Sequence, residues 1–232
     1  MSVFASLDVY HDDTPRSAAL NMSLDEALLE VADTASIRFY RWDHPALSFG
    51  YFGKFEDVAH LATQRDLVRR WTGGGIVLHG DDLTYSVVIP ASAEIFSHSS
   101  KSIYAEIHCA LRDALVTNGV SAELASLAGV GGAGAAVTDR GYNGESCFTN
   151  PVLADVLVNG QKVAGAAHRR TRAGLLHQGS IQHGALGIDF AERFASQLSD
   201  NCSGRNLNEA MVERARQIAE QKYGMKTWLC RR

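Results

Sequence analysis

Apolar residues recur at helical spacing in three parts of the chain. The first part begins near Leu20 and has apolar residues at positions 20, 24, 27, 28 and 31, which predicts an amphipathic helix. The second follows residue 99 or 100, with apolar residues at 103, 107, 111 and 115 and Gly119 as a stop signal. We expect the third from about residue 208 to 223, ended by Gly224.

Short runs with strand character separate these helices. Residues 37–42 and 46–52 are divided by His44-Pro45, and residues 154–158 and 161–168 flank Asn159-Gly160, which is typical of a two-residue hairpin turn. A turn at 172–174 then returns the chain through residues 175–182. Because hairpins and helices are mixed without regular alternation, the pattern predicts an α+β fold, most simply one sheet packed by helices.

The length and composition are those of an ordinary globular protein. The chain has 232 residues, of which 46% are hydrophobic and 21% charged, and no apolar run is long enough to cross a bilayer. The first eight residues lack the basic start and apolar segment of a signal peptide. We therefore expect one domain, residues 1–232, in the cytoplasm and with no membrane partner.

Charge, cysteines and histidines exclude several classes of site. A net charge of −4 argues against broad nucleic-acid binding, although arginines at 69, 70, 169, 170 and 172 predict a local basic patch suited to an acidic protein partner. The four cysteines form no CxxC pair, and the histidines at 79, 168, 177 and 183 lack the spacing of metal ligands. We expect neither a disulfide framework nor a metal site.

The most informative segment is residues 69–79, in which three glycines stand between two strand-like runs. Glycines are costly to order, so either the chain makes a plain tight connection here or its backbone approaches a ligand closely. Arg70 precedes the glycines and His79 follows them, and successive exposed N–H groups form a nest for an anion or a carbonyl. The segment matches neither a P-loop nor a dinucleotide fingerprint.

Two single residues further along the chain have chemical potential. Lys162 would ordinarily be an exposed lysine after a hairpin turn, but the small residues beside it leave room for a ligand. Residues 126–146 are rich in Gly, Ala and Ser and predict a mobile loop that ends at Cys147. A lone cysteine is commonly an apolar filler, but a nearby cation such as Lys162 would favour its thiolate and make it a nucleophile.

Together these segments resemble the biotin/lipoate protein ligase catalytic-domain family, and within it the lipoate-protein ligases and the cysteine-type octanoyltransferases. The resembling positions are residues 21–29, 69–79 with 83–86, and 162–167 through 179–181. The resemblance implies an α+β domain whose mixed, largely antiparallel central sheet cradles an acyl chain. It also implies Cys147 and Lys162 as catalytic residues. The substrate contacts that it implies are Arg70, Thr72, Gly73, Gly74, Gly75, His79, Gly165 and Ala166.

The family resemblance leaves two chemistries open. An octanoyltransferase would take octanoyl from octanoyl-acyl carrier protein as a cysteine thioester, without a cofactor. It would pass the group to a lysine of a lipoyl-acceptor domain, either the glycine-cleavage H protein or a dehydrogenase E2 subunit. A lipoate-protein ligase would instead use ATP with magnesium to make lipoyl-adenylate. The Cys147-Phe148 pair, which is similar to a segment of the cysteine-type transferases, favours the first.

One departure from the family supports a third, non-catalytic interpretation. The family commonly has a histidine immediately before the Gly-Ser of its last strand, whereas this chain has Gln178 there. A neutral amide donates hydrogen bonds but does not shuttle protons near neutral pH. His177 would replace the missing histidine only if the strand slipped its register, which a buried face resists. A module that binds acyl groups or lipoyl domains without turnover is therefore the remaining alternative.

Overall fold

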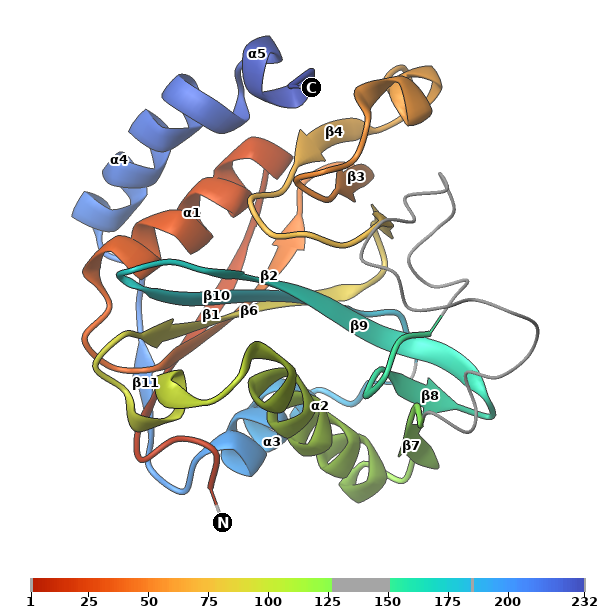
Figure 1. Cartoon of the computed structure of the whole chain (residues 1–232), viewed down its shortest axis with the longest axis vertical. Helices are drawn as coiled ribbons and strands as arrows, with labels where there is room; N and C mark the ends of the chain where they lie inside the picture. Colours follow the sequence, from red (N-terminus) through yellow and green to blue (C-terminus); the bar gives the residue numbers. More distant parts are fainter. Residues whose placement is uncertain (1, 127–150, 185, 232) are drawn as a thin grey trace.

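An eight-stranded sheet crosses the middle of the protein (Figure 1). The structure is a computed structural model that describes residues 2–126, 151–184 and 186–231. In spatial order, the strands are β11 (Cys202–Arg205), β1 (Leu7–Arg16), β2 (Ser36–Trp42), β6 (Leu83–Pro90), β10 (Gly174–Ile181), β9 (Gln161–Arg170), β8 (Val156–Val158) and β7 (Ala122–Leu124). β1 is parallel to both of its neighbours, and the remaining neighbouring pairs are antiparallel. The predicted α+β fold with a mixed, largely antiparallel sheet is confirmed.

A second, three-stranded sheet carries the strands on either side of the glycine run. Its order is β4 (Asp66–Arg69), β3 (Ala46–Phe49) and β5 (Ile76–His79). The expectation of a single sheet was therefore wrong. Pro45 explains the break after β2, because proline has no amide hydrogen to continue a sheet ladder. Its carbonyl instead accepts a hydrogen bond from the Asp66 N–H at 3.0 Å, at the start of β4.

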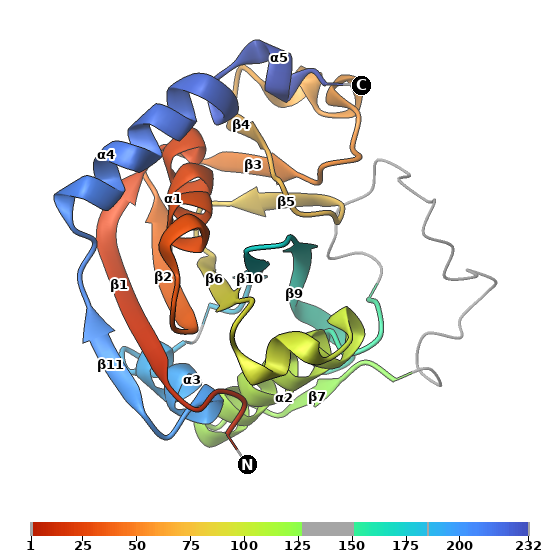
Figure 2. The ribbon, with the colours of Figure 1, turned by 60° about the vertical axis from the view of Figure 1, so that its left-hand side comes forward.

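Helices cover both faces of the large sheet (Figures 1 and 2). α1 (Ala18–Val31) and α4 (Glu209–Ile218) lie on one face, and α2 (Ser100–Thr117) and α3 (Phe190–Leu198) lie on the other. A π-helical turn (Ala219–Tyr223) and α5 (Lys226–Leu229) follow α4, and short 3-10 turns occupy residues 55–57, 59–61 and 94–97. No helix in the described ranges is long and apolar enough to cross a membrane. That residues 1–232 form one domain stays a prediction.

Local sequence signals account for the ends of the predicted helices and for the hairpin. The Ser99 hydroxyl caps α2 by accepting from the Ser102 N–H at 3.1 Å, and Gly119 beyond the helix has a φ of 84°. In the β8–β9 hairpin, Asn159 and Gly160 have φ values of 51° and 74°, as a type I′ turn requires. The three predicted helices and this turn are confirmed.

A buried ion cluster joins α1 to the large sheet. Arg38 Nη1 lies 2.9 Å from Asp25 Oδ1, and Arg38 Nη2 lies 2.7 Å from Asp12 Oδ2. The side chains of Arg38 and Asp25 are both 0% exposed. Asn21 and Ser86 complete the cluster, since the Asn21 amide oxygen accepts from Arg38 and the Ser86 hydroxyl donates to Asp25. The charges are thus paired and hydrogen-bonded, as burial requires.

Arg69 attaches the C-terminal helices to the small sheet. Its guanidinium is buried and donates to backbone carbonyls from two distant segments. The acceptors are Tyr51, Gly53, Trp228, Leu229 and Arg231, at 2.6 to 3.2 Å. Arg69 is the last residue of β4, and residues 70–75, here called the glycine connection, lead from β4 to β5. The bonds of Arg69 therefore also fix the start of the glycine connection.

We expect the substitution Arg69→Met to lower the free energy of unfolding by about 3 kcal/mol, because it leaves several buried carbonyls without their donor. Urea denaturation followed by circular dichroism measures the loss. Arg193→Met, at an exposed position of α3, is the control. Equal unfolding midpoints for the two variants would contradict the structural role of Arg69.

Candidate active site

The glycine run forms the connection between β4 and β5, and it packs on another part of the backbone. A Cβ atom added to Gly50 would lie 2.0 Å from the Gly74 carbonyl oxygen and 2.7 Å from the Gly73 carbonyl carbon. Gly74 has a φ of 84°, in the left-handed region that favours glycine. The close approach expected from the sequence is therefore made to the backbone at Gly50, while Gly74 also lines a cavity.

Arg70 fixes this connection from inside the protein. Its Nη2 donates to the carbonyls of Gly73 and Gly75, at 3.0 and 2.8 Å. Its Nη1 donates to Ser48 Oγ on β3, at 2.7 Å. Since the guanidinium is planar and its donors are fixed in direction, these three bonds set the shape of the glycine connection relative to β3.

The five arginines of the predicted basic patch do not share one exposed surface. Arg69 and Arg70 are 1% and 6% exposed and bond to groups inside the protein. Arg169 instead stacks on aromatic rings, with its guanidinium carbon 5.2 Å from the ring centroids of both Tyr51 and Trp71. The prediction was wrong because charge patterning does not show which guanidinium groups have buried carbonyl partners.

His79 and Asp82 organise the polar groups next to Arg70. His79 Nδ1 lies 2.8 Å from Asp82 Oδ2, and His79 Nε2 lies 2.7 Å from Ser48 Oγ. The hydroxyls of Thr84 and Ser180 donate to the same Asp82 oxygen. Burial lowers the pKa of His79, although Asp82 opposes this. Burial would raise the pKa of Asp82, but the bonds from His79 and Ser180 outweigh it and hold that pKa below its usual range. His79 is therefore neutral and Asp82 is charged near neutral pH.

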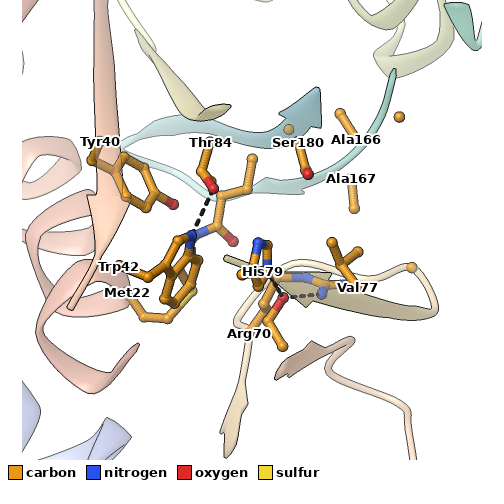
Figure 3. Close-up of a pocket in the computed structure, with 15 residues that line it drawn as sticks. Met22, Tyr40, Trp42, Arg70, Val77, His79, Thr84, Ala166, Ala167 and Ser180 are labelled. Carbon is orange, nitrogen blue, oxygen red and sulfur yellow. Dashed lines mark hydrogen bonds between the residues drawn. The ribbon is translucent and has the colours of Figure 1, made fainter. Parts of the chain in front are cut away.

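A cavity lies beside these groups (Figure 3). It is narrow, with a volume of about 30 Å³, and it opens to solvent. Figure 3 shows Met22, Tyr40 and Trp42 on one side of the cavity, opposite Ala166 and Ala167. The Trp42 indole N–H is bonded to Thr84 Oγ1, and other polar side chains at the wall are also hydrogen-bonded within the protein. The wall therefore offers mainly apolar surface, which suits an alkyl chain.

Several of the expected substrate contacts meet at this cavity. They are Arg70, Gly74, His79, Gly165 and Ala166. Three others have partners inside the protein. Thr72 donates its hydroxyl hydrogen to Gln178 at 2.8 Å, and Gly73 and Gly75 direct their carbonyls to Arg70.

Lys162 is buried rather than exposed on the hairpin. Its side chain is 3% exposed, and its Nζ lies 2.7 Å from Asp155 Oδ2. A Cβ atom added to Gly165 would lie 2.4 Å from Lys162 Cε, so a side chain larger than hydrogen would displace the lysine. The small residues beside Lys162 thus make room for the lysine side chain itself. This side chain packs against Gly165, which lines the cavity. Sequence analysis did not identify Asp155. In the sequence it is only a single carboxylate just before a hairpin strand.

The predicted nucleophile Cys147 and the predicted loop at residues 126–146 lie outside the described residues, apart from position 126 at the loop's start. Cys109, Cys202 and Cys230 are described, and none of them lines the cavity. In the part of the chain that the structure describes, no three His, Cys, Asp or Glu side chains are placed to hold a metal ion.

Gln178 connects the glycine connection to the buried ion cluster. Its amide oxygen accepts from the Thr72 hydroxyl at 2.8 Å, and its amide nitrogen donates to Asp25 Oδ2 at 2.7 Å. The strand keeps its register, with Gln178 opposite Ala167 of β9. His177 consequently faces away from the cavity, next to Tyr85. His177 does not take the place of the family's histidine.

Three histidines, two of them buried and His168 half-buried, pack around Tyr104 behind the sheet. The ring centroids of His108, His168 and His177 lie 4.0, 5.4 and 5.8 Å from that of Tyr104. Burial lowers the pKa of His108 and of His168 to about 4 and holds the pKa of His177 well below its usual value. One ring nitrogen of each has no hydrogen-bond partner among the described residues. These side chains are therefore uncharged near neutral pH.

Sequence comparison relates this chain to enzymes of protein lipoylation. The family model of the lipoyl protein ligase A/B catalytic domain matches residues 17–214. The octanoyltransferase LipM of Oceanobacillus iheyensis is 37% identical over 180 residues, which cover 73% of this chain and 62% of the relative. The LipM of Geobacillus kaustophilus is 33% identical over 213 residues, covering 88% of this chain and 72% of the relative. The match with the first of these thus spans less than two thirds of its length.

Solved structures of lipoate ligases share the fold. Lipoate-protein ligase A bound with ATP superposes with a TM-score of 0.76 at 20% identity, covering 97% of this chain and 98% of the other. A bi-partite lipoate protein ligase from Thermoplasma acidophilum, studied with its E2 lipoyl domain, gives a TM-score of 0.72 at 20% identity. That match covers 98% of this chain and 96% of the other.

We expect Gly50→Ala to disrupt the glycine connection. The added methyl group would meet the Gly74 carbonyl, and overpacking of this kind costs about 1–3 kcal/mol or more. Gly73→Ala is the matched control, because a Cβ atom there has no neighbour within 4 Å. Thermal unfolding measures both variants. If Gly50→Ala melts at the same temperature as Gly73→Ala, the backbone contact is not tight.

We expect His177→Phe to make the protein less sensitive to acid. Unfolded histidine takes up a proton below its ordinary pKa of 6.5, whereas the buried ring does not, so native wild type loses stability as pH falls below 6.5. At pH 5 this amounts to about 2 kcal/mol. Urea denaturation at pH 7.5 and pH 5 measures the effect, with exposed His60→Gln as control. An equal acid-induced loss in wild type and His177→Phe would refute the burial argument.

Proposed function

Because the chain belongs to the lipoyl protein ligase A/B catalytic-domain family, we propose that it transfers an octanoyl group from a carrier-protein thioester to a lysine of a lipoyl-acceptor domain. The observation that carries this proposal is the 37% identity with an enzyme named octanoyltransferase. The apolar cavity supports it, since an eight-carbon chain needs such a surface. This reaction uses no cofactor.

The proposed reaction has two acyl-transfer steps. The Cys147 thiolate attacks the thioester carbonyl, a new thioester forms on Cys147, and the carrier thiolate leaves and takes up a proton. The neutral amine of the acceptor lysine then attacks this thioester. An amide bond forms, the bond to Cys147 sulfur breaks, and the proton lost by the amine goes to the leaving thiolate.

Lys162 and the glycine connection are the proposed partners of the developing oxyanion. The buried Lys162 ammonium is adjacent to Gly165 at the cavity. Because the Gly73 carbonyl points to Arg70, the N–H of Gly74 in the same trans peptide points away from Arg70 and is a second donor. Removing one such donor typically costs about a hundredfold or more in rate.

An ATP-dependent lipoate ligase is the second candidate. It is favoured by the structural neighbours named as ligases, one of them bound with ATP. In that reaction Cys147 would have no covalent role. The acceptor would be the same, and the T. acidophilum ligase studied with its E2 lipoyl domain is consistent with such a partner.

We expect intact-mass spectrometry to detect one octanoyl group on Cys147 after the protein is mixed with octanoyl-acyl carrier protein. Transfer to an acceptor domain should proceed without ATP, vanish in Cys147→Ala, and fall about a hundredfold in Lys162→Met. Cys109→Ala is the control thiol variant. Transfer by Cys147→Ala would overturn the mechanism. A strict requirement for ATP and lipoate would establish the ligase, and octanoate binding without either reaction would establish a binding module.

A further inference from the structure

Tyr104 of α2 is bonded to two parts of the candidate site that are far from it in sequence. Its hydroxyl donates to Asp155 Oδ1 at 2.5 Å and accepts from the Ala166 N–H at 3.2 Å. The other Asp155 oxygen lies 2.7 Å from Lys162 Nζ. One phenol therefore contacts the residue that holds Lys162 and also the backbone at the cavity wall.

The strand arrangement explains why this phenol is needed at Ala166. β8 pairs with β9 only as far as Ala164, so the Ala166 N–H on that edge extends beyond its neighbouring strand. A buried N–H without a partner is costly, and the Tyr104 oxygen supplies the acceptor that β8 does not. The Tyr104 hydroxyl thus accepts a hydrogen bond from β9 and at the same time donates one to Asp155.

The surroundings of Tyr104 make its bond to Asp155 strong. Asp155 is fully buried, and the Val152 N–H also donates to its Oδ2 at 2.7 Å. The histidines packed on Tyr104 are uncharged, as described above. Burial and the nearby Asp155 raise the pKa of Tyr104, so the phenol keeps its proton. In such a desolvated network each donor has a large effect on the position of the others.

We propose that Tyr104 is a positioning residue that, through Asp155, fixes the Lys162 ammonium at the acyl carbonyl, an inference that rests on the proposed transferase function. Tyr104 touches no reacting atom. Without its hydroxyl, the Asp155 carboxylate rotates and Lys162 follows it. A displacement of about 1 Å at a catalytic group can cost a hundredfold in rate.

The test compares Tyr104→Phe with Tyr85→Phe, a second buried tyrosine whose hydroxyl is bonded to His177 at 3.3 Å and not to Asp155. We expect kcat for octanoyl transfer to fall about tenfold or more in Tyr104→Phe with KM within about twofold, because the alkyl cavity is unchanged. Tyr85→Phe should keep the wild-type kcat. In an Asp155→Asn background, Tyr104→Phe should change kcat less than about twofold, because the two residues act as one unit.

A chemical measurement separates this inference from the proposed function. Limited acetylation of the folded protein, mapped by peptide mass spectrometry, reports how firmly each lysine is held. We expect Lys162 to react several-fold faster in Tyr104→Phe than in wild type, with no change at Lys222, which is paired with Glu26. Matching thermal unfolding of Tyr104→Phe and Tyr85→Phe shows that the change is local.

The outcomes are distinct. In the first outcome, wild type transfers octanoyl, and Tyr104→Phe changes neither kcat nor Lys162 acetylation. This outcome would overturn the positioning role and leave the proposed transferase function intact. Inactive wild type with faster Lys162 acetylation in Tyr104→Phe would overturn the transferase and retain Tyr104 as the residue that holds Lys162. Additive effects of Tyr104→Phe and Asp155→Asn on kcat would also overturn the inference.

Discussion

The ion pair between Arg38 and Asp25 is the contact on which the position of the cavity depends. Both side chains are fully buried, so each charge requires its partner. Asp25 also accepts from Gln178, and Gln178 accepts from Thr72 at the start of the glycine connection. A continuous set of bonds therefore runs from the sheet interior to the glycines, and a change at one member is felt by the others.

The glycine connection is held from two further directions. Arg70 binds its carbonyls and is itself oriented by Ser48, His79 and Asp82. Gly50, which immediately follows β3, packs against it. Three independent constraints thus converge on a few residues, which explains how a segment with so much intrinsic freedom is held in one conformation. Order at this point comes from the surrounding side chains and not from the glycines.

Sequence patterns predicted those parts of the fold whose causes are local. Helical spacing and a serine cap predicted α2, and Asn159-Gly160 predicted the turn of the β8–β9 hairpin. Strand β1 was missed because it contains the polar run 11–14. Asp12 within it is buried because it is paired with Arg16 of the same strand and with Arg38, 26 residues away. The same reason hid Asp155 and Tyr104, since their roles arise from the packing of α2 on the sheet. Five cavity residues were predicted by resemblance, namely Arg70, Gly74, His79, Gly165 and Ala166. The aromatic and hydroxyl side chains of the cavity wall, and the partners that hold them, required the three-dimensional structure.

The cavity wall has a consequence for the acyl chains that the proposed transferase would accept. Contact with apolar surface separates chains that differ by one methylene by only about 1–3 kcal/mol. The Trp42 and His79 rings, stacked 4.1 Å apart, are each tied by hydrogen bonds to Thr84 or Asp82, so this part of the wall resists deformation. A ligand that displaced these two rings would break their hydrogen bonds, so the rings oppose added bulk on this side of the cavity. Chains that differ by one methylene are discriminated only weakly.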